Sequence, residues 1–157
     1  MATLVRAICL GAALLCVAGL AGCAGADGRL SKTEYEQKVQ SVYAEVQQAF
    51  VRTNVTDPGE LAERVEDAQD ELRDAAEELE GVQPPEDVEA ENAQIAGGFR
   101  AYAEDLDRLR NAAEQGDERT IADFNSRIGR RESVGQITEA AESIKFKGYD
   151  IGLIAEE

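Results

Sequence analysis

The chain has 157 residues, of which 32 are acidic and 16 are basic, and its formal net charge is −16 at neutral pH. This excess of acid argues against binding to nucleic acid, because contacts with phosphate groups need a basic surface. Histidine is absent and all three cysteines lie in the first 23 residues. The chain therefore lacks the ligands for His/Cys zinc or copper sites and for Glu-x-x-His di-iron sites, and it lacks Ser-His-Asp or Cys-His catalytic groups. We expect no enzyme, no cofactor and no metal site.

The N-terminal segment has the pattern of a secretion signal. Arg6 supplies a positive charge, and an uncharged, mostly apolar run follows from Ala7 to Leu20. A membrane-spanning helix needs about 20 apolar residues, so this run is too short for a span and has the length of a signal-peptide core. The sequence therefore predicts a signal peptide over residues 1–22.

The motif at the end of this segment resembles the lipobox of bacterial lipoproteins, and it consists of Leu20, Ala21, Gly22 and Cys23. The resemblance implies that the Cys23 thiol receives a diacylglyceryl group and that a lipoprotein signal peptidase cleaves before it. Acylated Cys23 would then anchor the protein in the bilayer, on the extracytoplasmic side of the cell membrane, because two or more acyl chains give stable attachment. The alternatives are an ordinary signal peptide with an incidental cysteine, or an uncleaved anchor. Residues 23–30 are predicted to form a short flexible tether.

Two amphipathic helices are predicted next. Ser31 and Glu34 fit a capping box, and the apolar stripe behind them extends the first helix to about Thr53. Asp57 and Pro58 form a second start signal. The second helix has a coiled-coil-like seam of alternating four- and three-residue steps and ends at Gly81 as a C′ glycine. The seam consists of Leu61, Val65, Ala68, Leu72, Ala75 and Leu79.

The third helix is predicted from about Glu86 to Glu114, and Gly97 and Gly98 lie in its middle, where we expect close packing of a neighbouring helix or a bend. A fourth apolar pattern runs from Ile121 to Ile144 and changes phase between two glycines, which predicts one kinked helix or two in series. The tail is expected to dock on the bundle through Phe146, Ile151, Leu153 and Ile154.

Together these elements predict an all-α domain over residues 31–157, an antiparallel up-and-down four-helix bundle whose fourth helix is kinked or split. The many acidic residues of the second helix lie away from its seam, so we interpret them as a solvated face. Aromatic residues of the first, third and fourth helices either fill the core or line an apolar pocket. They are Tyr35, Tyr43, Phe50, Phe99, Tyr102 and Phe124.

The stretch from Val82 to Leu109 resembles a pattern in uncharacterised small helical lipoproteins of actinobacteria. In that pattern a Pro-Pro-Glu turn precedes a helix with an aromatic-rich tract before Asp-Leu. The resemblance implies a fold and a location, and it assigns no site residue.

From these features we expect a membrane-anchored, non-enzymatic envelope lipoprotein. Its acidic helical domain would serve as an interaction or accessory module for another envelope protein. The alternative is a lipoprotein that binds a small apolar ligand between its helices. The sequence leaves the oligomeric state open.

Overall fold

The computed structural model describes residues 28–53 and 57–152, and every regular element within these ranges is helical. The elements are α1 (Lys32–Arg52), α2 (Pro58–Glu80), the 3-10 helix η1 (Glu86–Val88), α3 (Glu89–Glu114), α4 (Glu118–Arg127), the 3-10 helix η2 (Ile128–Arg130) and α5 (Glu132–Phe146). The all-helical prediction is confirmed, and the fourth helix is split. The residues of the predicted lipobox, Leu20, Ala21, Gly22 and Cys23, and the tail residues Leu153 and Ile154 lie outside the described residues.

The predicted start signals act as predicted. Ser31 and Glu34 form a reciprocal capping box at the start of α1, and the Asp57 carboxylate accepts a hydrogen bond from the Glu60 N–H at the start of α2. One end signal differs from the prediction. Gly81 follows the last residue of α2, but its φ of −73° is right-handed, so no left-handed C′ glycine ends this helix.

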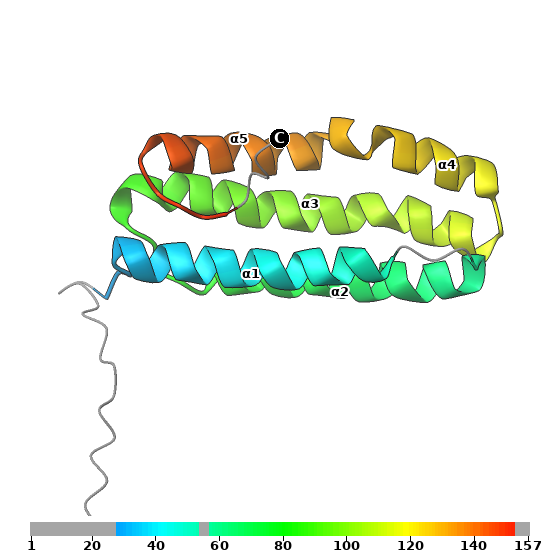
Figure 1. The fold of residues 1–157 in the computed structure, drawn as a ribbon, viewed down its shortest axis with the longest axis horizontal. Helices are drawn as coiled ribbons and strands as arrows, with labels where there is room; N and C mark the ends of the chain where they lie inside the picture. The colour runs from blue at the N-terminus through cyan, green and yellow to red at the C-terminus, as the bar shows by residue number, and fades with distance from the viewer. Residues whose placement is uncertain (1–27, 54–56, 153–157) are drawn as a thin grey trace, which may run out of the picture.

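The helices pack as a chain of neighbours. Figure 1 shows α4 and α5 end to end along one side of α3, with α1 and α2 along the other side. The most extensive contact joins α2 to α3, while α5 packs mainly against α3 and α1 mainly against α2. All six residues of the α2 seam are buried, as predicted. The buried core residues in the part of the chain that the structure describes all lie between Tyr35 and Ile151, so a fragment of residues 24–157 retains them.

Two buried polar side chains join helices inside this core. The Gln69 amide donates hydrogen bonds of 2.8 Å to the Ala103 carbonyl oxygen and to the Asp107 carboxylate, which links α2 to α3. Asn92 donates to the Leu79 carbonyl oxygen and accepts from the Tyr35 hydroxyl. Since a buried polar group without a partner is costly, these bonds fix the relative positions of the helices.

The glycine pair of α3 separates into two different environments. A Cβ atom on Gly98 would lie 2.5 Å from Cγ1 of Ile137 and 3.3 Å from the Ser133 carbonyl oxygen. A Cβ atom on Gly97 would meet nothing within 4 Å. The predicted close packing is therefore confirmed at Gly98, where α5 crosses α3.

The C-terminal tail docks differently from the prediction. Phe146 is 94% exposed, so its predicted contact with the bundle is wrong, whereas Ile151 is buried as predicted. Tyr149 takes the place expected for Phe146, because the turn at Gly148 (φ +88°) directs its ring edge-on to Tyr35, with 5.9 Å between the ring centroids. Its hydroxyl also donates to Asp87 at 2.7 Å.

The tail thereby joins α1 at the end of the bundle where α1 begins, which we call the Ser31 end. Lys32 Nζ donates to the Gly148 carbonyl oxygen at 2.6 Å, and the Gln40 amide donates to the Asp150 carbonyl oxygen at 2.7 Å. The connection between α2 and α3 lies at the same end, since the Leu30 N–H donates to the Gln83 carbonyl oxygen.

The buried tyrosines predict a loss of stability in alkali. Burial raises the pKa of Tyr102 to about 12, and burial together with its hydrogen bond to Asp87 raises the pKa of Tyr149 to about 12. Tyrosines of the unfolded chain ionise near pH 10. Between about pH 10 and 12 the unfolded state therefore binds fewer protons than the folded state, and the free energy of unfolding falls as pH rises.

Chemical denaturation of residues 24–157 at several pH values between about 8 and 12 measures this slope. In the Tyr149→Phe variant the decline is expected to be shallower, because one of the contributing phenols is gone. A free energy of unfolding that stays flat or rises over this interval would contradict the prediction.

Candidate functional site

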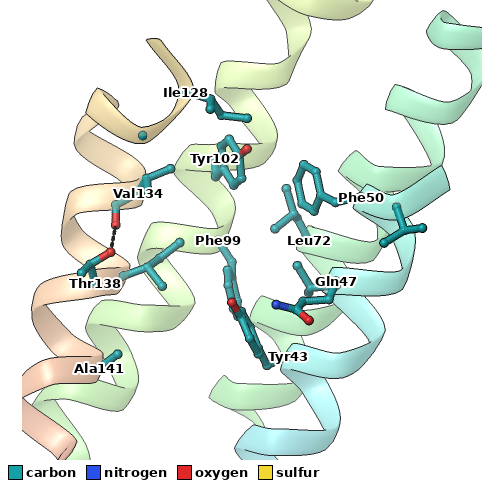
Figure 2. Close-up of a pocket in the computed structure, with 14 residues that line it drawn as sticks. Tyr43, Gln47, Phe50, Leu72, Phe99, Tyr102, Ile128, Val134, Thr138 and Ala141 are labelled. Carbon is teal, nitrogen blue, oxygen red and sulfur yellow. Dashed lines mark hydrogen bonds between the residues drawn. The ribbon is translucent and has the colours of Figure 1, made fainter. Parts of the chain in front are cut away.

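A groove runs between α1 and α5, on the side where these two helices face each other over α3. Its volume is about 700 Å³, within the range of small-molecule sites. Figure 2 shows side chains from α1 on one side, from η2 and α5 on the other, and from α2 and α3 between them. The lining residues are Tyr43, Val46, Gln47, Phe50, Val51, Leu72, Phe99, Tyr102, Ile128, Gly129, Val134, Ile137, Thr138 and Ala141.

Aromatic side chains at helical spacing build the floor of the groove. Phe50 reaches from α1 to α3 and stacks on Tyr102, with ring centroids 5.3 Å apart and planes 7° from parallel. Such an offset stack holds the two helices at the distance set by the rings. The opposite wall is formed by smaller groups, including Gly129 and Ala141, so the space beside the rings stays open.

The groove is open to solvent at its rim. Gln47, Gly129 and Thr138 are exposed, and Val51 is 76% exposed although it is apolar. Large exposed apolar groups next to a concave apolar surface are typical of binding sites.

A few polar groups lie within this mostly apolar surface. The Tyr102 phenol is protonated at neutral pH, as tyrosines ordinarily are, and can donate a hydrogen bond; burial raises its pKa further, to about 12. Thr138 Oγ1 donates to the Val134 carbonyl oxygen at 2.9 Å, which leaves its lone pairs to accept a hydrogen bond (Figure 2). The Gln47 amide at the rim can donate and accept. The arrangement therefore suits an apolar molecule that carries one or two hydrogen-bonding groups.

The structure shows which aromatic residues line the groove and which fill the core, a question that the sequence left open. Tyr43, Phe50, Phe99 and Tyr102 line the groove, whereas Tyr35 and Phe124 are buried in the core and do not line it. Sequence reasoning missed the α5 wall, formed by Val134, Ile137, Thr138 and Ala141. Their spacing along one helix face was the available signal, but it is equally typical of core residues.

The acidic face of α2 behaves as a solvated surface, as predicted. Its carboxylates are exposed or half-buried. Several form ion pairs with arginines of the same helix, as Glu60 and Asp67 do with Arg64. Within residues 28–53 and 57–152, no three His, Cys, Asp or Glu side chains are grouped so that they could hold a metal ion. Among the helices that the structure describes, none is both long and apolar enough to span a membrane.

Comparisons with known proteins were made with family models, with curated proteins and with solved structures. None of the three gives a match to this chain.

Proposed function

We propose that this protein is a lipoprotein, anchored in the cell membrane through acylated Cys23 on the extracytoplasmic side, whose helical domain binds a small apolar molecule in the groove between α1 and α5. The observation that carries the proposal is the open, aromatic-floored cavity of about 700 Å³. A helical bundle that served only as a spacer would close this side by packing α1 against α5, because exposed apolar surface is unfavourable.

The proposed arrangement of the domain is an antiparallel up-and-down bundle. Hydrogen bonds bring the start of α1 next to the residues after α5 and next to the connection between α2 and α3. The connections from α1 to α2 and from α3 to α4 are short, which favours antiparallel neighbours. In this arrangement α1 and α5 are the two outer helices of the series, and the groove lies between them.

The anchor would hold the Ser31 end of the bundle close to the bilayer. Leu30 and Arg29 already bind the connection between α2 and α3, through the carbonyl oxygens of Gln83 and Pro84. Of the residues after Cys23, only 24–27 are left to cross from the lipid to the bundle, and they span at most about 14 Å. The groove begins at Tyr43, about three turns of α1 beyond this end of the bundle.

The shape of the groove favours an elongated ligand such as the acyl or prenyl chain of a lipid. Its walls follow two long helices, from Tyr43 to Val51 on one side and from Ile128 to Ala141 on the other. The polar groups at Tyr102, Thr138 and Gln47 would hold a single hydroxyl or carbonyl group of the ligand.

Blocking the groove tests the proposal. Thr138 lines the groove and is exposed, so Thr138→Trp fills the cavity without replacing a core residue. We expect residues 24–157 to bind the neutral fluorophore N-phenyl-1-naphthylamine in a saturable manner. The Thr138→Trp variant should bind it at least about tenfold more weakly, equivalent to about 1.4 kcal/mol.

Glu139→Trp is the matched control, because it adds the same ring to the next residue of α5, which is exposed and does not line the groove. It should bind the fluorophore as the unsubstituted protein does. Two results would count against a ligand in this groove. One is failure of the unsubstituted protein to bind the fluorophore, and the other is equal affinity of the Thr138→Trp and Glu139→Trp variants for it. Mass spectrometry of lipids that copurify with the anchored protein would identify the natural occupant.

The role as an interaction module for another envelope protein stays a prediction from the sequence. Pull-down from membranes with the unsubstituted and Thr138→Trp domains tests it. A partner recovered equally by both would bind elsewhere on the surface, and a partner lost with Thr138→Trp would compete for the groove.

A further inference from the structure

A second cavity, of about 480 Å³, lies where α3, α4 and η2 meet, and arginines dominate its lining. Its lining residues are Arg108, Asp123, Arg127, Arg130 and Arg131. None of them lines the apolar groove. Four guanidinium groups around one small cavity are unusual in a chain with twice as many acidic as basic residues, because like charges at short range repel each other.

Asp123 holds two of the arginines. One carboxylate oxygen lies 2.9 Å from Arg127 NH2, and the other lies 3.7 Å from Arg108 NH2. Both oxygens of Asp123 are therefore engaged. Each guanidinium group has five N–H donors, so Arg108 and Arg127 have further donors available at the cavity.

Arg131 is held by two contacts, one with Asp105 and one with Phe124. Its NH1 lies 2.8 Å from Asp105, whose other oxygen accepts from the Ser133 hydroxyl at 2.6 Å. Its guanidinium carbon lies 3.9 Å from the centroid of the Phe124 ring, in cation–π geometry. Its Nε is buried and has no hydrogen-bond partner. The positive charge of Arg131 is thus rigidly placed beside the cavity.

Arg130 is the fourth arginine of the cluster, and its side chain is not held by an ion pair within the described part of the chain. It is exposed, and among the residues that the structure describes it has no ion-pair partner. With Asp105 and Asp123 as the paired carboxylates, the four guanidinium groups retain a surplus of two positive charges. A bound dianion would balance this surplus.

We propose that the arginine cavity binds the phosphate group of a phosphate monoester. Guanidinium groups match the oxygens of phosphate in bidentate geometry, and a monoester carries close to two negative charges at neutral pH. Arg131 is the fixed member of the site, the exposed Arg108 and Arg127 are oriented by Asp123, and Arg130 offers its guanidinium group to the ligand. The phosphate group belongs either to a soluble compound or to a phospholipid headgroup.

Calorimetric titration of residues 24–157 with inorganic phosphate at low ionic strength tests the site in solution. The same protein is tested for cosedimentation with phosphatidylcholine vesicles, with and without phosphatidic acid, which carries a phosphate monoester. Arg130→Gln and Arg127→Gln are each expected to weaken phosphate binding about tenfold or more. Arg130→Gln should leave the melting temperature unchanged, because Arg130 is exposed and without an ion pair.

Arg119→Gln is the matched control, because it removes an exposed arginine from the same helix α4 outside the cavity. Binding of inorganic phosphate that depends on Arg127 and Arg130, but not on Arg119, supports a soluble phosphate compound. The same dependence seen only on phosphatidic acid vesicles supports a lipid headgroup. Absence of binding in both assays, or an equal loss with Arg119→Gln, overturns the proposal.

Discussion

Replacing Cys23 with serine is expected to remove lipid attachment completely. The thiol of Cys23 is the nucleophile that would take the diacylglyceryl group, and serine does not replace it in the lipoproteins that this motif resembles. Because a single acyl chain already gives only marginal membrane binding, a protein with no acyl chain loses its stable anchor. Labelling of cells with radioactive palmitate and mass spectrometry of the purified protein measure the effect. The label should be present in the unsubstituted protein and absent from Cys23→Ser.

Cys16→Ser is the control, because it removes a cysteine from the apolar run and leaves the lipobox intact. It should keep both the label and the cleavage before residue 23. In Cys23→Ser the segment 1–22 should remain attached, since cleavage follows lipidation in those lipoproteins. An unsubstituted protein that is cleaved but carries no acyl group would refute the proposed anchor.

The second large effect is expected at the crossing of α3 and α5. Gly98→Leu places a side chain where even a Cβ atom would lie 2.5 Å from Ile137 and 3.3 Å from a backbone oxygen of α5. The backbone of α5 cannot yield as a flexible side chain would, so the helix must move away from α3. We expect a loss of about 3 kcal/mol in the free energy of unfolding, near the upper end for overpacked sites. For a domain of this size the melting temperature should fall by on the order of 10 °C.

Gly97→Leu separates this packing effect from helix propensity. Its Cβ atom meets nothing within 4 Å, so leucine there should stabilise α3 by about 0.5–1 kcal/mol relative to glycine. Thermal unfolding of both variants by circular dichroism gives the comparison. Equal shifts of the two melting temperatures, in either direction, would be inconsistent with the close approach of α5 to Gly98.

The helices could be predicted from the sequence because the patterns that specify them are local. The Ser31 capping box, the Asp57 cap and the α2 seam each depend on residues within one or two turns, and all three are confirmed. The change of phase in the fourth apolar pattern predicted a kinked or divided helix, and the structure shows two helices. Gly81 shows the limit of such rules, since its position at the helix end was predicted but its left-handed conformation was not adopted.

Features that depend on contacts between distant residues were not accessible. Gln69 and Asn92 have side chains of a type common at the surface, but in the core their amide N–H groups donate to partners on other helices, while Gln69 Oε1 has no hydrogen-bond partner among the described residues. The tail was expected to dock through Phe146, and the turn at Gly148 presented Tyr149 instead.

The two cavities also depend on contacts between residues that are distant in the sequence. The aromatic stripes were visible in the sequence, yet the stripe pattern could not say whether α1 and α5 would close over Tyr43, Phe99 and Tyr102. That outcome is decided by which helices pair, and the pairing of α1 with α2 and of α5 with α3 leaves this side open. The arginine cavity joins Arg108 of α3 to residues that follow the turn between α3 and α4.

Among the described residues, the tail bridges α1 and α5 at the Ser31 end through Lys32, Gln40 and Tyr149. Without these contacts, α1 and α5 would be joined through the intervening helices α2 and α3. Substitutions in the tail that remove them are therefore expected to change the separation of α1 and α5, and with it the width of the groove.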